Sequence, residues 1–261
     1  PHAHARIAAI RVDHAARASG VLRIIIGRDP EIAGLGSFPC EVKLASRDGR
    51  PLVVPPRRAM ASDRARFCGE IVAMVVAESL DRARDAAELI EIDYDALPAA
   101  IALDAALRPE ASQIWDEAPG NLCFDWECGD AAATAAAFER AAHVVRMSLR
   151  NNRICPAPIE PRGAIGLYDP VDASYTLHSS TQGSHYIRNL LAGPVLGIAP
   201  EKLRVITPDV GGAFGLKLFP HPEQPLVLIA ARLVGRPVRW IADRSESFLS
   251  DNAARDQMNE A

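Results

Sequence analysis

Short runs of β-branched residues bounded by glycine or proline alternate with alanine-rich stretches along this chain. Residues 20–27 and 71–77 are such runs and predict buried strands. Ser79 is a good N-cap for a helix over residues 81–90, and residues 91–95 alternate as a strand. Residues 71–95 therefore predict a strand, a helix and a strand in a compact α/β unit. The prolines between residues 28 and 67 indicate connecting loops.

The second half of the chain also combines helix-like and strand-like hydrophobic patterns. Helices are predicted over residues 131–142, 184–196 and 223–233, the last two ending at Gly197 and Gly235. Strands are predicted over residues 143–150, 175–181, 202–207 and 238–242. Residues 98–120 are rich in proline, glycine and polar side chains, which is typical of a linker. We therefore expect an α/β (α+β) fold with two domains, residues 1–120 and 121–261.

Composition narrows the class of protein. The 261 residues are 49% hydrophobic and 24% charged, which excludes a mostly disordered chain. The net charge of -4 argues against nucleic acid or an acidic membrane as a partner. No apolar run approaches the ~20 residues that span a bilayer, and no signal peptide is visible. The five cysteines are an odd number and widely spread, so we expect reduced thiols and a cytoplasmic protein.

The stretch Gly-Gly-Ala-Phe-Gly-Leu-Lys at residues 211–217 is the most informative local feature. It follows a predicted strand, and clustered glycines let backbone N–H groups approach an oxyanion or a metal oxo group. The spacing matches neither a phosphate loop nor a dinucleotide-binding loop. A purely structural turn is the alternative.

Other candidates are weaker. His2 and His4 share one face of an extended segment but lack further metal ligands at suitable spacing, and no hydrolase motif surrounds His185. Gln182 ends a predicted strand, where its amide is able to bind a ligand at the mouth of a sheet or simply start a helix. Glu160 and Arg162 flank Pro161 and form either a structural ion pair or part of a site.

Taken together, seven segments in the same order resemble one family: the large, molybdenum-cofactor-binding subunit of the xanthine dehydrogenase and aldehyde oxidase family, especially its bacterial carbon monoxide dehydrogenase-like branch. The resemblance spans nearly the whole chain. The segments are residues 1–7, 69–94, 116–121, 159–162 (Ile-Glu-Pro-Arg), 180–182 (Ser-Thr-Gln), 209–217, and 235–238 with 243–246.

The resemblance implies a fold, cofactors and partners. Residues 1–120 correspond to a hammerhead-type α/β domain, and residues 121–261 to the first part of a molybdopterin-binding domain. The implied activity is hydroxylation of an aldehyde or N-heterocycle with water as the oxygen source. The implied cofactor is molybdenum on molybdopterin, in its cytosine dinucleotide form. FAD and [2Fe-2S] clusters would reside on partner subunits, and the assembly would be a dimer of heterotrimers.

The resemblance also assigns residues. Gln182 matches the glutamine whose amide hydrogen-bonds a molybdenum oxo ligand, and Phe214 matches a residue that faces the reacting centre. The cofactor-binding positions are Gln182, Gly211, Gly212, Ala213, Phe214 and Gly215.

Departures from the family pattern limit the substrate. Leu218 stands where purine-oxidising members carry a substrate-binding glutamate, so xanthine is disfavoured. The family's general-base glutamate and its copper-binding cysteine loop correspond to positions beyond Ala261. We therefore expect the 261 residues to be inactive without a further C-terminal region. The alternative is a non-catalytic binding or assembly module derived from this fold.

Overall fold

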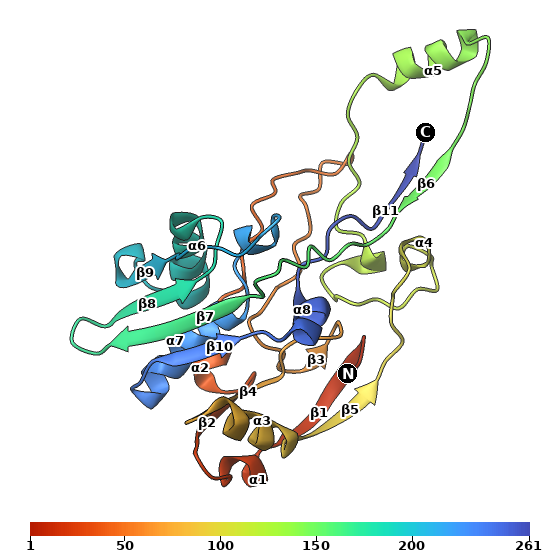
Figure 1. Ribbon diagram of the computed structural model, residues 1–261. Helices are drawn as coiled ribbons and strands as arrows, with labels where there is room; N and C mark the ends of the chain where they lie inside the picture. Colours follow the sequence, from red (N-terminus) through yellow and green to blue (C-terminus); the bar gives the residue numbers. More distant parts are fainter. The chain divides into compact units, whose positions relative to one another are not determined.

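The computed structural model describes residues 1–261 and divides into two compact units (Figure 1). Unit 1 contains Pro1–Pro39, Pro56–Pro98 and Cys155–Asn252. Unit 2 contains Cys40–Pro55, Ala99–Ile154 and Ala253–Ala261. Both units are discontinuous in sequence. The division into domains at residue 120 stays a prediction.

The N-terminal part of unit 1 holds two small antiparallel sheets. In one, β1 (Ala5–Arg11) lies between β3 (Arg64–Ala65) and β5 (Glu91–Ala96). In the other, β2 (Val21–Ile26) pairs with β4 (Ala73–Ala77). The short helices α1 (Asp13–Ala16) and α2 (Pro30–Ala33) follow β1 and β2. These elements confirm the strands predicted over residues 20–27, 71–77 and 91–95, while β1 was not predicted.

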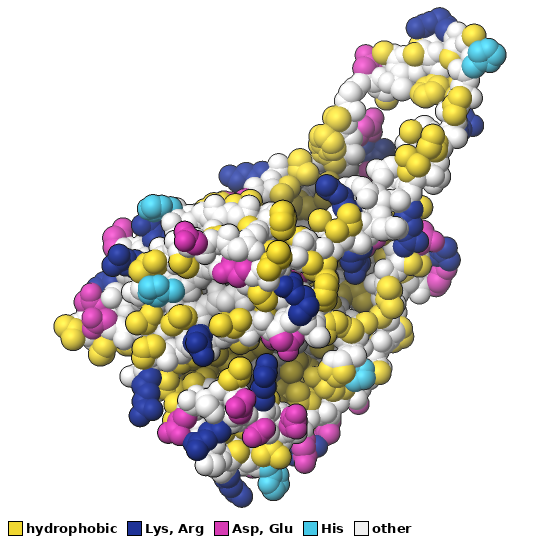
Figure 2. All heavy atoms as spheres, in the orientation of Figure 1, with side chains coloured by type: hydrophobic (Ala, Val, Ile, Leu, Met, Phe, Trp, Pro, Cys, Tyr) yellow, Lys and Arg dark blue, Asp and Glu magenta, His cyan; other side chains and the backbone are white.

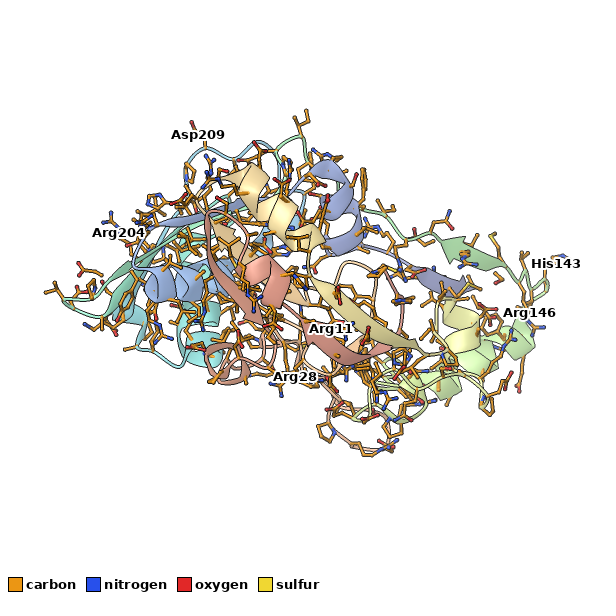
Figure 3. The ribbon with its side chains drawn as sticks, turned by 90° about the horizontal axis from the view of Figure 1, so that it is seen from below. Arg11, Arg28, His143, Arg146, Arg204 and Asp209 are labelled. Carbon is orange, nitrogen blue, oxygen red and sulfur yellow. The ribbon has the colours of Figure 1, made fainter.

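The strand, helix and strand predicted over residues 71–95 are all present. Helix α3 (Leu80–Glu88) is confirmed together with its cap, because the Ser79 hydroxyl accepts a hydrogen bond from the Arg82 N–H at 3.3 Å. However, β4 and β5 belong to different sheets. β5 pairs with β1, across which Arg11 forms ion pairs with Glu91 and Asp93 (Figure 3).

The C-terminal part of unit 1 is a four-stranded sheet in the order β10-β7-β8-β9. Its strands are β7 (Gly163–Asp169), β8 (Ser174–Ser179), β9 (Leu203–Ile206) and β10 (Val238–Ile241). The pair β8 and β9 is parallel, and helix α6 (Ser184–Leu191) makes the crossover with a π-helical turn at Ala192–Leu196. A three-residue 3-10 turn, Pro200–Lys202, leads into β9.

Helix α7 (Glu223–Val234) packs on strand β7 and is buried along most of its length. It ends at Gly235, and the helical segment after residue 184 ends at Gly197, as predicted; both glycines have positive φ angles near +65°. Helix α8 (Arg244–Ser250) follows β10 and is capped by Asp243, which accepts from the Glu246 N–H at 2.7 Å.

One hydrophobic cluster joins the two parts of unit 1. Ile25, Phe38 and Val76 from the N-terminal part share it with Leu177 and Leu226 from the four-stranded sheet and α7. The N–H of Gly36 also donates to the carbonyl of Val195 at 2.8 Å. Residues 1–39, 56–98 and 155–252 therefore contribute to a single core.

Unit 2 has little regular structure. Strands β6 (Ser148–Asn151) and β11 (Gln257–Glu260) form an antiparallel ribbon, accompanied by α4 (Leu103–Ala106), the turn Pro119–Asn121 and α5 (Ala131–Arg140). Asn121 organises the loops: its side-chain N–H groups donate to Ala106 and Ser112, and its oxygen accepts from the Ile114 N–H.

Of the strand predicted over residues 143–150, only the end from Ser148 forms, as part of β6. The apolar side chains Val144, Val145 and Met147 are exposed, as is Phe138 of α5. Figure 2 shows hydrophobic side chains at the surface around α5. The backbone pairing begins at Met147, which exchanges two hydrogen bonds with Ala261 at 2.8 and 2.9 Å, and continues with Ser148 opposite Glu260 on β11. A lone strand without a partner is not stable in water.

The space around Gly166 on β7 shows how closely the sheet and helix α7 approach each other. A Cβ at Gly166 would lie 2.4 Å from the Val227 carbonyl oxygen, whereas a Cβ at Gly163 on the same strand would meet nothing nearer than 3.7 Å. We expect Gly166→Ala to lower the free energy of unfolding by ~1–3 kcal/mol and Gly163→Ala by less than ~0.5 kcal/mol. Urea unfolding of both variants checks this, and equal losses would contradict the packing described.

Candidate functional site

Gln182 and the glycine loop, which lie far apart in sequence, are adjacent in unit 1. Gln182 follows the end of β8, and its N–H donates to the carbonyl of Lys217 at 3.0 Å. The Gln182 side chain is exposed, and its amide makes no hydrogen bond within the chain. The amide is thus free to bind a ligand beside the loop.

The loop of residues 211–215 presents backbone donors. Gly212 and Gly215 have φ angles of +103° and +88°, a region that favours glycine, and Phe214 takes φ of 53°. The N–H groups of residues 212–215 donate no hydrogen bond within the chain. The Phe214 side chain is 76% exposed. Free N–H groups on a backbone of this kind suit an oxyanion or an oxo group.

Glu160 holds the base of this loop. Its Oε2 accepts from the Gly211 N–H at 2.8 Å and from Lys217 Nζ at 2.7 Å, and its Oε1 accepts from the Ser180 hydroxyl at 2.8 Å. Its N–H donates to the Gly211 carbonyl at 3.0 Å. Partial burial raises the pKa of this carboxyl, but the hydrogen bonds from Lys217, Ser180 and Gly211 outweigh burial and hold the pKa below its ordinary value.

The ion pair considered between Glu160 and Arg162 is absent, because each has other partners. Arg162 is buried and donates from Nη1 to both carboxylate oxygens of Glu223 at 2.7 Å. Its Nε donates to Asp251 at 2.7 Å and its Nη2 to the Ser250 hydroxyl at 2.6 Å. Burial raises the pKa of Glu223 against the opposing effect of Arg162.

A buried polar layer that sequence reasoning missed lies beneath the loop. His221 Nε2 lies 2.9 Å from the Leu216 carbonyl, and the His221 N–H donates to the Gln224 side-chain oxygen at 3.0 Å. The Gln224 amide donates to the Ser179 hydroxyl at 3.3 Å. The lone histidine between Pro220 and Pro222 offered no recognisable pattern. This layer links the end of the loop to β8.

The other sequence candidates lie elsewhere. His4 Nδ1 contacts the Pro98 carbonyl at 2.7 Å and His2 packs against Tyr94, and no group of three potential metal ligands is present. The five cysteines are free thiols. His185 lines a pocket of about 330 Å³ together with Arg188 and Arg204. None of the residues assigned to the cofactor lines this pocket.

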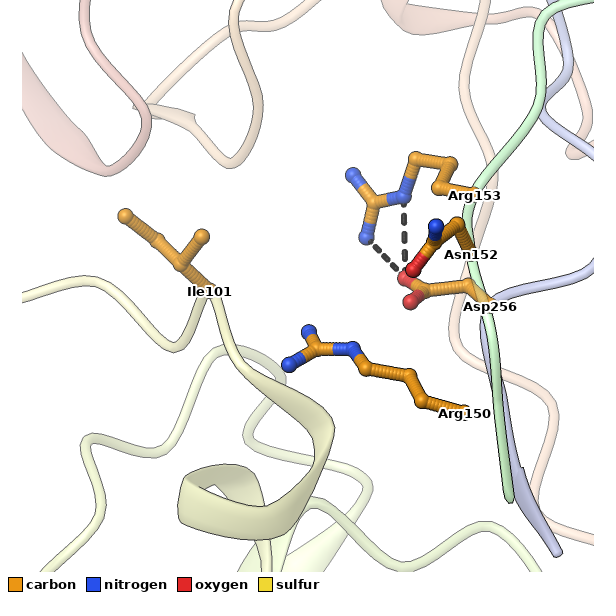
Figure 4. Close-up of a pocket in the computed structure, with 5 residues that line it drawn as sticks. All are labelled: Ile101, Arg150, Asn152, Arg153 and Asp256. Carbon is orange, nitrogen blue, oxygen red and sulfur yellow. Dashed lines mark hydrogen bonds and ion pairs between the residues drawn. The ribbon is translucent and has the colours of Figure 1, made fainter.

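A pocket of about 370 Å³ lies in unit 2 (Figure 4). Arg153 pairs with Asp256 at one side, and Arg150 extends into it. Its lining residues are Ile101, Arg150, Asn152, Arg153 and Asp256. They include no nucleophile and none of the candidate site residues. The glycine loop with Gln182 therefore remains the candidate functional site.

Comparison with protein families shows to which family the chain belongs. Residues 114–261 match the sequence profile of the family described as "Molybdopterin cofactor-binding domain". The chain belongs to this family. Residues 1–98 match the profile "Aldehyde oxidase and xanthine dehydrogenase, a/b hammerhead domain". The resemblance found in the sequence and the expected order of a hammerhead fold followed by a molybdopterin-binding fold are thereby confirmed.

Relatives of this molybdopterin-binding chain are large subunits of oxidoreductases. It is 30% identical to the carbon monoxide dehydrogenase large chain of Hydrogenophaga pseudoflava, over 98% of the chain and 32% of the relative. It is 31% identical to the nicotine 6-hydroxylase large subunit of Paenarthrobacter nicotinovorans, over 98% of the chain and 30% of the relative. The chain thus spans about a third of the length of these relatives.

Solved structures show the same fold. Quinoline 2-oxidoreductase from Pseudomonas putida 86 superposes with a TM-score of 0.85 at 35% identity, over 100% of this chain and 32% of that one. Aldehyde oxidoreductase from Desulfovibrio gigas gives a TM-score of 0.83 at 26% identity, over 97% of this chain and 27% of that one. No helix of the molybdopterin-binding chain has the length and apolar character needed to cross a bilayer.

The residues of the candidate site fit the cofactor that this family binds. An oxo-bearing cofactor requires hydrogen-bond donors, and the site offers the exposed Gln182 amide beside the free N–H groups of residues 212–215. The exposed Phe214 ring supplies an apolar surface at the same loop. The roles of the individual residues stay predictions.

His221 gives the layer beneath the loop a defined pH dependence. Burial, followed by repulsion from Arg162, lowers the pKa of His221 from 6.5 to about 3. The His221 ring therefore binds a proton below pH 6.5 in the unfolded chain, but only below about pH 3 in the folded chain. The stability contributed by the neutral ring is complete above pH 6.5 and is lost progressively as the pH falls toward 3.

We expect the free energy of unfolding of the wild type to fall by up to ~1.4 kcal/mol more per pH unit than that of His221→Gln between pH 6 and pH 4. The glutamine keeps an amide N–H for the Leu216 carbonyl but has no titrating ring. Urea unfolding at several pH values, followed by tryptophan fluorescence, measures the difference. Parallel pH profiles would show that His221 does not titrate in this way.

Proposed function

We propose that the chain forms one wall of the active site of a molybdenum hydroxylase that oxidises an aldehyde or an N-heterocycle. The observation that carries this proposal is the meeting of Gln182 with the donor-rich loop of residues 211–215, through the bond from the Gln182 N–H to Lys217. When bound, molybdenum on molybdopterin supplies oxygen transfer and two-electron redox chemistry.

The chain's own groups orient the cofactor and stabilise its negative charge. The Gln182 amide donates to an oxo group, and the N–H groups of residues 212–215 offset negative charge on the cofactor. Such fixed dipoles need no reorganisation when charge develops, which is why preorganised donors accelerate reactions. The ring of Phe214 forms an apolar wall that holds a planar substrate and excludes water.

The choice of substrate class follows from Leu218 and from the relatives. Leu218 offers no charge to bind a purine. The names of related proteins include a nicotine 6-hydroxylase and a quinoline 2-oxidoreductase, which are named for N-heterocycles, and aldehyde oxidoreductases. An apolar side chain at residue 218 suits a flat heterocycle or an aldehyde better than a purine with several polar groups.

The proposal extends to the form of the cofactor and the assembly. The pterin would carry a cytosine dinucleotide, and partner subunits in a cytoplasmic dimer of heterotrimers would hold the FAD and [2Fe-2S] clusters for electron transfer. Turnover requires the longer natural protein, since the chain spans about a third of its relatives' length. For the same reason, the 261 residues alone are expected to oxidise no substrate.

Metal analysis of the natural protein, purified from its own host with its co-purifying subunits, tests the proposal. We expect about one molybdenum and one pterin per large subunit, and oxidation of quinoline-like or aldehyde substrates. Gln182→Leu should keep the metal but lower kcat at least ~10-fold, because one preorganised donor is lost. Gln113→Leu in unit 2 is the matched control and should leave kcat unchanged. A folded protein without molybdenum would instead favour a non-catalytic binding module.

A further inference from the structure

The Glu160 carboxylate joins every segment that bears a predicted cofactor contact, although it makes no such contact itself. One oxygen accepts from the Ser180 hydroxyl at 2.8 Å, two residues before Gln182. The other accepts from the Gly211 N–H at 2.8 Å, at the start of the donor loop, and from Lys217 Nζ at 2.7 Å, at its end. The three donors come from two parts of the sequence, and the carboxylate is their common partner.

These bonds close a ring. Lys217 binds Glu160 through its ammonium group and receives the Gln182 N–H on its carbonyl at 3.0 Å. Gln182 is connected back through Thr181 to Ser180, whose hydroxyl returns to Glu160. The backbone of Gln182 and the donor loop are therefore both held in place through the Glu160 side chain.

The negative charge of Glu160, and not only the shape of its side chain, is needed to hold the buried Lys217 ammonium. The Lys217 side chain is only 1% exposed, and a buried ammonium requires a counter-ion close by. Its other hydrogen-bond acceptor is the neutral Glu160 carbonyl at 3.0 Å. A glutamine at residue 160 would leave Lys217 without a negative partner and would offer one acceptor oxygen where the carboxylate has two.

The close fit of Gly211 supports the same conclusion. A Cβ at Gly211 would lie 2.6 Å from the Glu160 Cβ, so the start of the loop rests directly on the glutamate stem. Together with the backbone bond from the Glu160 N–H to the Gly211 carbonyl and the bond from the Gly211 N–H to the Glu160 carboxylate, this contact holds the start of the loop against Glu160.

We propose that Glu160 is a positioning residue that sets the Gln182 amide and the N–H groups of residues 212–215 in register for one oxo-bearing cofactor. The role rests on the proposed function, since the register matters only if these donors share a ligand. Glu160 acts through Ser180, Gly211 and Lys217.

Glu223 provides the matched control for a merely structural role. It is also a glutamate paired with a basic side chain in unit 1, and it is more deeply buried than Glu160. Its hydrogen bonds go to Arg162 and none goes to residues 211–217. Glu223→Gln should therefore destabilise unit 1 without releasing the loop.

Amide hydrogen exchange on the full 261-residue chain reads the register without any cofactor. In Glu160→Gln we expect the amides of Gly211, Gln182 and Leu216 to exchange at least ~10-fold faster, because their bonds lose a common support. Ser180→Ala, which removes one of the three bonds to the carboxylate, should give a smaller increase and keeps the test available if Glu160→Gln does not fold. Glu223→Gln should lower Tm while leaving these three amides protected.

Kinetics of the natural holoenzyme provide the second readout. Glu160→Gln should lower kcat at least ~10-fold with little change in KM or molybdenum content, because the donors remain but are misplaced. Unchanged exchange at the three amides, or an equal increase in Glu223→Gln, would overturn the positioning role. Absence of molybdenum from the wild type would overturn the proposed function instead, and the exchange results would be unaffected by it.

Discussion

Unit 1 depends on one buried cation, the guanidinium of Arg162. A charge removed from water is tolerated only where its donors are satisfied, and Arg162 meets this demand with Glu223 on α7 and with Ser250 and Asp251 at the end of α8. Its guanidinium also lies over the ring of Trp240 on β10, 5.6 Å from the ring centroid. The beginning of β7, helix α7, strand β10 and the end of helix α8 are thus fixed around a single side chain.

The candidate site lies beside this cation in the chain but has its own set of contacts. Glu160 precedes Arg162 by two residues, with only Pro161 between them. Its carboxylate bonds to Ser180, Gly211 and Lys217, and none of these residues bonds to Arg162. A surface loop with several positive φ angles would otherwise sample many conformations.

The sequence predicted those elements whose signals are local. Helix α7 has a continuous apolar face and a terminal glycine, helix α3 has its serine cap, and β2 and β4 are β-branched runs. Strand β7 escaped prediction because Gly163, Gly166 and Asp169 give it little strand character of its own. It forms because β8, β10 and α7 surround it. The strand expected over residues 143–150 is mostly absent for the opposite reason, since its apolar alternation has no strand partner before Met147, whose N–H and carbonyl both bond to Ala261.

For the site, the resemblance predicted Gln182 and the loop as cofactor contacts, and the structure places Gln182 against Lys217, just after the loop. The partners of Glu160 were beyond sequence reasoning, because Arg162 stands nearer in the chain than Lys217 and offers an equally good charge. Likewise, nothing marks His221 as the group beneath Leu216, because a single histidine carries no periodicity. Contacts of long sequence separation are fixed by the packing of whole elements, which a linear pattern does not encode.

The hydrophobic core of unit 1 does not follow the boundary between the two family profiles. The two family profiles meet between residues 98 and 114, yet Ile25, Phe38 and Val76 are packed in the same cluster as Leu177 and Leu226. At the contact between Gly36 and Pro194 there is no room even for a methyl group, since a Cβ would lie 1.9 Å from the proline carbonyl oxygen. A cut in the chain between the profiles would therefore divide the hydrophobic core of unit 1 between two pieces.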